Sequence, residues 1–225
     1  MKKITKLVVI FILTAFVFTS CKKATENKEE IVTEVKEVTK IKEDIKTTVL
    51  NANLASETDL NGLGLSSELV TQIIEKRPFL DMNDLDHMFE GQDKELLYSK
   101  IFVPFNLNTT AEDDFKIIPG VGDRMAHEFE EYRPYTSVLQ FKKEIGKYVD
   151  EVEVARYLNY VFVPVELNTA SENDIKALPG VGNRMAHEFE EYRPYNSLAQ
   201  FRKEIGKYVD DKELSRLERF VYLKK

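Results

Sequence analysis

An internal repeat with an offset of 60 residues constrains the fold of this chain more than any other feature. Residues 107–165 align with residues 167–225 without gaps, and 36 of the 59 positions are identical. Such identity cannot arise from shared composition, so the two stretches are duplicated structural units. The match is densest at 124–135, which equals 184–195 residue for residue.

A third, more divergent copy precedes these two. Residues 53–63 align with 108–118, and residues 75–79 align with 131–135 after a deletion of one residue. The predicted boundaries give a first copy at 48–105, a second copy at 106–165 and a third copy at 166–225.

Each copy is predicted to form helices joined by a tight glycine turn. In the third copy, Ser171 caps a short helix that Pro179-Gly180 ends. A second helix begins at Asn183 and ends before Pro194, because a proline restricts the residue before it. Apolar residues at helical spacing mark a third and a fourth helix: Phe201 and Ile205, then Leu214, Leu217 and Phe220. No stretch alternates long enough to make a sheet, so the predicted fold is all-α.

The N-terminus has the pattern of an export signal. Lysines at positions 2, 3 and 6 precede an apolar run from Leu7 to Phe18, which is too short for a membrane-spanning helix. The single cysteine, Cys21, follows after Thr19 and Ser20. This pattern resembles a bacterial lipoprotein signal at residues 1–20, although Phe18 stands where that family usually has Leu. The resemblance implies that Cys21 is lipidated and anchors the protein to a membrane. An ordinary signal peptide with a chance cysteine is the alternative, and residues 21–47 are predicted to be a flexible or partly helical tether.

Composition and motifs argue against catalysis. With one cysteine in 225 residues, a disulfide framework and a zinc site built on several thiolates are both excluded. No Ser/His/Asp, Cys/His or metal-ligand arrangement is visible, so we expect a protein without catalytic residues, metal or cofactor. The acidic residues Glu128, Glu130 and Glu131, like their third-copy counterparts, are predicted to line a solvated helix face.

The glycine turn is the one motif that carries chemistry. It reads Ile118-Pro-Gly-Val-Gly-Asp-Arg-Met-Ala126 in the second copy and Leu178-Pro-Gly-Val-Gly-Asn-Arg-Met-Ala186 in the third. We expect both glycines to supply positive φ and to leave room for a ligand, and the valine between them to enter the core. A helix begins directly after the turn, so its amides and its dipole favour an anion, to which the nearby arginine adds a charged contact.

The larger pattern, Leu167 to Gly182 followed by Glu191-Tyr192-Arg193-Pro194-Tyr195, resembles the tandem helix-hairpin-helix domain of ComEA-like competence proteins. The resemblance implies non-specific binding of double-stranded DNA in the cell envelope, with a role in DNA uptake or retention. The residues that it assigns to the DNA phosphates are Gly120, Val121, Gly122 and Arg124 in the second copy, and Gly180, Val181, Gly182 and Arg184 in the third. The resemblance of residues 1–20 to a lipoprotein signal adds that the protein is lipid-anchored, at the outer membrane or the periplasmic face.

The first copy and the second half of each later copy depart from this pattern. The first copy reads Leu63-Gly64-Leu65-Ser66, without the proline or the second glycine, so no phosphate site is expected there. The stretches 145–150 and 205–210 keep one glycine each, followed by an aspartate.

Charge singles out the third copy. The first copy has 4 basic and 10 acidic residues, the second 7 and 11, and the third 11 and 11. The net charge of −7 therefore predicts weak DNA binding that salt abolishes, and the neutral third copy is its best candidate. The alternative is a non-catalytic envelope lipoprotein that binds another protein, since a similar module docks proteins in photosystem assemblies. The sequence leaves the oligomeric state open.

Overall fold

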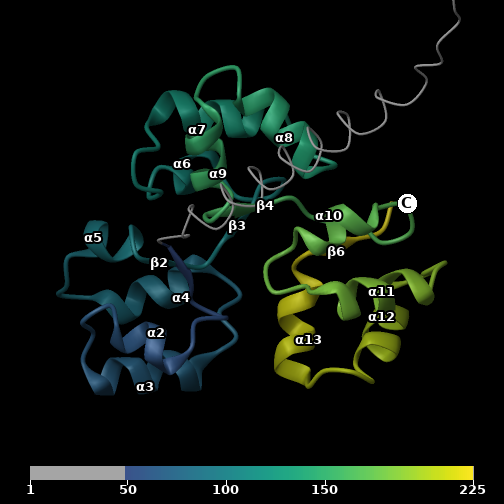
Figure 1. Ribbon diagram of the computed structural model, residues 1–225, viewed down its shortest axis with the longest axis horizontal. Coiled ribbons are helices and arrows are strands. Elements are labelled where there is room, and N and C mark those ends of the chain that lie inside the picture. Colours follow the sequence, from purple (N-terminus) through teal and green to yellow (C-terminus); the bar gives the residue numbers. More distant parts are fainter. Residues whose placement is uncertain (1–48, 225) are drawn as a thin grey trace, which may run out of the picture. The chain divides into compact units, whose positions relative to one another are not determined.

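The computed structural model describes residues 49–224, which belong to one compact unit (Figure 1). The predicted signal at 1–20, the predicted lipidation site Cys21 and the predicted tether at 21–47 lie outside the described residues. The described part is mostly helical, with twelve α-helices and one 3-10 helix. None of these helices combines the length and hydrophobicity needed to cross a bilayer.

Each copy contributes its own set of helices. The first copy contains α2 (Glu57–Asn61), α3 (Ser67–Lys76), α4 (Met82–Asp86), the 3-10 helix η1 (His87–Phe89) and α5 (Lys94–Tyr98). The second contains α6 (Glu112–Phe115), α7 (Asp123–Glu131), α8 (Val138–Ile145) and α9 (Glu151–Tyr157). The third contains α10 (Glu172–Lys176), α11 (Asn183–Glu191), α12 (Leu198–Ile205) and α13 (Asp211–Glu218). The four helices predicted in the third copy are therefore all present.

The prediction of a fold without any sheet is wrong in one respect. Within residues 49–224, six strands of two residues form three parallel pairs, each joining the start of a copy to its end. The pairs are β1 (Leu50–Asn51) with β2 (Ile101–Phe102), β3 (Phe105–Asn106) with β4 (Val161–Phe162), and β5 (Val165–Glu166) with β6 (Val221–Tyr222). Strands this short are invisible to a search for alternation, because a period of two needs several residues to show.

Side-chain caps fix most helix starts. Nine of the twelve described α-helices have a Ser or Asp N-cap whose side chain accepts a hydrogen bond from a backbone N–H of the first turn. The exceptions are α6, which follows Ala111, and the two helices that follow a glycine turn, α7 and α11.

An arginine before a cis proline ties the end of each long hairpin helix to the start of its copy. In the third copy, Arg193 donates from Nε to Leu167 O at 2.6 Å and from Nη2 to Ala170 O at 2.8 Å. The backbone N–H of the buried Tyr195 donates to Asn168 Oδ1 at 2.7 Å. These hydrogen bonds fix the C-terminal end of α11 against residues 167–170.

Aromatic side chains fill the core of each later copy. Phe129 of α7 meets Phe115 and Tyr157 edge to face, with ring centroids 5.3 and 5.2 Å apart. In the third copy, Phe189 of α11 meets Phe201 in the same way at 5.0 Å. Such pairs favour this geometry because the positive ring edge faces the negative ring face. The hairpin helices are thus anchored on their inner side.

Candidate nucleic-acid interface

The first glycine of each turn has a backbone that favours glycine. The φ angle is +80° at Gly120 and +73° at Gly180, and the equivalent Gly64 of the divergent first copy has +79°. Residues with a side chain rarely adopt this left-handed backbone conformation. All three copies therefore use glycine to make the same bend. The intervening Val121 and Val181 are buried, as predicted, and fix the turn on the core.

The second glycine differs from the prediction. Gly122 and Gly182 have φ of −96° and −87° with ψ near 180°, which is extended backbone that any residue adopts. A Cβ atom on either residue would meet no heavy atom within 4 Å. Neither conformation nor packing therefore requires glycine at these two positions. What the missing side chain provides is open space at the outer edge of the turn.

That open space lies at a helix start that no side chain caps. The helix starts at Gly122 and Gly182 have no side-chain cap hydrogen bond. In the first copy, Ser66 stands at this position and accepts a hydrogen bond from Leu69 N at 3.2 Å. The second and third copies thus leave the first-turn amides of α7 and α11 available to a ligand, whereas the first copy uses its own serine.

Each complete turn is flanked by an exposed arginine resting on a tyrosine. The Arg124 guanidinium lies 5.6 Å from the ring centroid of Tyr148, and that of Arg184 lies 6.0 Å from Tyr208. The Tyr148 hydroxyl is 2.7 Å from that of Tyr132, and this hydrogen bond raises the pKa of Tyr148, so Tyr148 stays neutral.

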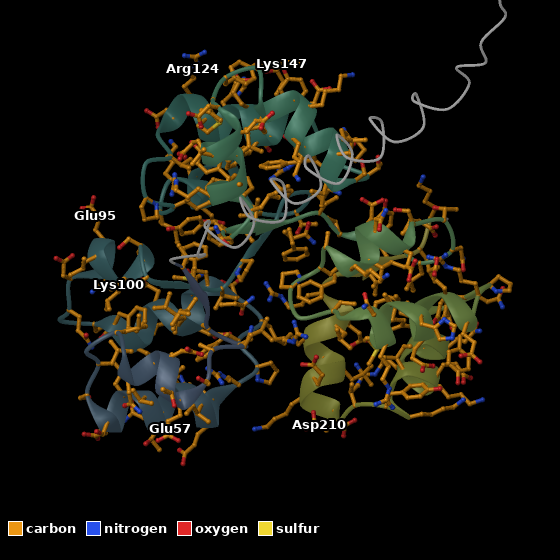
Figure 2. The ribbon with its side chains drawn as sticks, viewed as in Figure 1. Glu57, Glu95, Lys100, Arg124, Lys147 and Asp210 are labelled. Carbon is orange, nitrogen blue, oxygen red and sulfur yellow. The ribbon has the colours of Figure 1, made fainter. Side chains whose placement is uncertain are left out.

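A second cation joins this cluster from the following turn. Lys147 Nζ lies 4.7 Å from the ring centroid of Tyr132, and Lys207 repeats this contact with Tyr192. Figure 2 shows Arg124 and Lys147 pointing outward at the same end of the second copy. Each later copy therefore has two basic side chains beside its uncapped helix start, and the lysine of each copy also pairs with Glu144 or Glu204.

The turns of the second and third copies differ in charge. In the second copy, Lys116 Nζ pairs with Asp123 at 2.6 Å and with Asp113 at 2.8 Å. The hydrogen bond from Lys116 lowers the pKa of Asp123, so a carboxylate stands at the start of α7 at neutral pH. In the third copy the corresponding residue is the neutral Asn183. The third copy therefore offers an anion the less repulsive turn.

The later glycines at 146 and 206 do not form a second site of this kind. Gly146 has φ of −61°, and a Cβ there would stand 2.6 Å from Lys142 O, so close packing explains the glycine. The helices that follow are capped by Asp150 and Asp210, which accept hydrogen bonds from Glu153 N and Glu213 N. One first-turn amide of each of these helices is therefore already in use.

Some residues around the turns escaped the sequence analysis. Glu128 and Glu188 were expected on a solvated face, but both are 9% exposed, and one carboxylate oxygen of each makes no hydrogen bond. Arg156 and Arg216 lie directly beneath the two complete turns. The available signal was the repeat itself, which keeps this glutamate and this arginine in both later copies.

Residues 49–224 contain no cluster of His, Cys, Asp and Glu side chains arranged to hold a metal ion. No curated protein and no solved structure matches the chain. One family model does match, and it covers β4 and the whole of the third copy's helices. Residues 161–222 of this chain therefore carry a helix-hairpin-helix motif.

Proposed function

We propose that this protein binds the backbone of double-stranded DNA, without sequence preference, through the glycine turns of its second and third copies. The family match at residues 161–222 supports such a function, because the helix-hairpin-helix motif is a DNA-binding motif in many proteins that contain it. The second copy would bind DNA in the same way, because its turn has the same backbone conformation and Arg124 at the position of Arg184. The three copies then form a tandem series in which the first serves another purpose.

One observation carries the proposal. A chain that caps nine of its twelve described α-helices with a Ser or Asp side chain places glycine at the two helix starts next to Arg124 and Arg184. Neither Gly122 nor Gly182 is needed there for the fold. A phosphate oxygen that approaches this edge accepts hydrogen bonds from free amides, gains from the helix dipole and meets a guanidinium.

The cellular setting belongs to the same proposal. With a lipoprotein signal at residues 1–20 and acyl chains on Cys21, the protein would be held at the bacterial cell envelope. There it would retain DNA or assist its uptake, as a binding protein without catalytic activity. Metabolic labelling with a fatty-acid analogue tests the anchor, because Cys21→Ser should abolish the label.

Salt-dependent DNA binding tests the central claim. A chain that begins at Lys22 retains every described residue and is titrated with duplex DNA at increasing salt. Because each neutralised phosphate contributes about −0.9 to the slope of log K against log salt, two turns predict a slope of roughly −2 to −4. The Arg124→Ala/Arg184→Ala double variant should lose most of this binding.

A charge-matched variant separates a local site from bulk charge. Lys76→Ala/Lys100→Ala removes two cations from the first copy, which has no complete turn, and should bind almost as the parent does. Equal weakening by both double variants would refute the assignment of the site. Absence of binding by the parent at low salt would refute DNA binding altogether.

Protein binding is the second candidate function. The observation that favours it is the Lys116–Asp123 pair, which places a carboxylate at the turn of the second copy. The first copy adds exposed Leu80 and Leu96 to a strongly acidic surface. Crosslinking in cells distinguishes the two functions, because a protein partner recovered after nuclease treatment supports this candidate.

A further inference from the structure

A buried arginine lies directly beneath the turn of the third copy. Arg216 of α13 has a side chain that is 2% exposed, and its Nη1 donates to Pro179 O at 2.6 Å. Glu213, one helical turn earlier, accepts from Nε at 2.7 Å and from Nη2 at 2.5 Å. The Arg216 guanidinium therefore links two groups: the Pro179 carbonyl at the start of the turn and the Glu213 carboxylate on α13.

The same arginine limits what the turn can contain. Its Nη2 lies 3.0 Å from where a Cβ on Gly180 would stand, and the Leu54 side chain lies 2.8 Å from that point. The Arg216 guanidinium also rests on the Phe220 ring, 5.3 Å from its centroid. Because stacking, ion pairing and a carbonyl contact hold it together, its position is well defined.

The second copy repeats the ion pair without the contact to the carbonyl of the turn. Arg156 of α9 donates to Glu153 from Nε and Nη2 at 2.7 and 2.6 Å, and its Nη2 lies 3.3 Å from the Cβ position of Gly120. Its side chain is 28% exposed, and no hydrogen bond joins it to Pro119 O. Its turn is thus supported from below but less firmly tied than that of the third copy.

The first copy serves as a natural comparison. The alignment that pairs Ile101 with Val161 places Leu96 at the position of Arg156, and Leu96 is half exposed on α5. This copy also lacks the proline and the second glycine, and it caps its own helix with Ser66. The supporting arginine and the open turn are therefore present together in two copies and absent together in one.

We propose that Arg216, held by Glu213, is a positioning residue that fixes the third-copy turn so that its free amides point toward a DNA phosphate. Arg156 and Glu153 perform the same task less firmly in the second copy. This inference rests on the proposed function for its ligand but makes a separate claim about the turn. Arg216 itself touches no phosphate, because it is buried behind the turn.

Two readouts on the chain that begins at Lys22 test this role. Backbone NMR shifts of Gly180, Val181 and Gly182 report the turn, and duplex titration at low salt reports affinity. Arg216→Met should shift those three amides and weaken binding about tenfold, the scale expected for a lost charged hydrogen bond. Arg156→Met should act on the amides of the second-copy turn, with a smaller loss of affinity.

Two variants separate positioning from charge and from general destabilisation. Lys212→Met removes an exposed cation from the same helix and should leave the three amides in place. Arg216→Lys keeps the charge but cannot span Glu213 and Pro179 together, so it should resemble Arg216→Met. A thermal scan shows whether each variant is folded. If Arg216→Met does not fold, Arg156→Met provides the test in the second copy.

The outcomes are distinct from those of the proposed function. Unchanged turn amides in Arg216→Met, or parental affinity in Arg216→Lys, would overturn the positioning role. Shifted amides with weaker binding would support it. If the parent binds no DNA, the proposed function fails, and a titration with inorganic phosphate, followed by the same amides in parent and variants, decides the positioning role alone.

Discussion

Gly180 and Gly182 stand one residue apart, and the structure gives each a different reason to be glycine. Gly180 has positive φ and close neighbours, whereas Gly182 has extended backbone and open surroundings. The fold therefore requires glycine at the first position, whereas the proposed function explains the glycine at the second. The sequence cannot distinguish the two glycines, because the residue type does not determine the backbone dihedral angles.

Alanine at each position should separate stability from binding. Gly180→Ala should lower the free energy of unfolding by about 1–3 kcal/mol, because it forces a side chain into a left-handed backbone against Leu54. Gly182→Ala should leave stability within about 0.5 kcal/mol and weaken duplex binding, because its methyl group enters the space of the phosphate. Urea unfolding and DNA titration measure the two effects, and a large loss of stability in Gly182→Ala would contradict the assignment.

Several residue-scale features could be predicted, and others could not. The buried valine of the turn follows from its place between two glycines, and the exposed arginine follows from its helix position. The burial of Glu128 could not be predicted, because it depends on Tyr148, which approaches from the turn after α8. Local sequence patterns thus predict the residues of the turn itself. The burial of side chains around the turn depends on contacts between distant parts of the copy.

At the scale of helices, the choice of N-cap decides which helix starts are open. Nine of the twelve described α-helices have an N-cap side chain that accepts a hydrogen bond from a first-turn amide. The helix starts at Gly122 and Gly182 have no such cap. In the second copy the start of α7 also carries Asp123, whose carboxylate pairs with Lys116. The two open helix starts are therefore not equivalent toward an anion.

Asp123→Asn should make the second copy resemble the third. At neutral pH the parent carries an ionised Asp123, because Lys116 lowers its pKa, and this charge repels a phosphate at the helix start. Removing it also releases Lys116 from one of its two partners. We expect about a threefold to tenfold gain in duplex affinity at low salt, measured by titration, with the difference shrinking as salt rises. The reciprocal Asn183→Asp should weaken binding, and an unchanged affinity in both would show that this residue lies away from the DNA.

Helices were more predictable than strands for a physical reason. The starts and ends of α10–α13 depend on a cap, a proline or apolar spacing within about four residues, so the sequence contains the necessary information. Each strand pair joins residues about fifty apart, and its hydrogen bonds involve only the backbone, as between Leu50 N and Lys100 O. Such pairing leaves almost no mark on side-chain pattern.

At the scale of the whole described unit, one arginine links the third copy to the first. Arg219 donates from Nη1 to Phe79 O at 3.4 Å and from Nη2 to Pro104 O at 3.1 Å, and its guanidinium lies over Phe162. Burial lowers its pKa to about 10. The repeat alignment could not reveal this contact, because the second copy has Asn159 at the same position.

Arg219→Met should destabilise the described unit without altering either turn. Loss of two hydrogen bonds to buried or half-buried carbonyls should lower the free energy of unfolding by about 1–3 kcal/mol. Thermal or urea unfolding measures this, with Asn159→Met as the matched control in the second copy, where Asn159 bonds only within its own helix region. Identical stability of the two variants would show that the link between copies contributes nothing.

The parallel strand pairs have a mechanical consequence. In each copy the entering and leaving chain segments lie side by side and run in the same direction, as in β5 and β6. A pull that separates the two ends of a copy therefore drags these strands past each other, loading their hydrogen bonds together in shear rather than opening them one at a time. Tension applied between the two ends of a copy would meet this resistance before it reached the helices, so the copy could stay folded while the chain on either side of it was pulled.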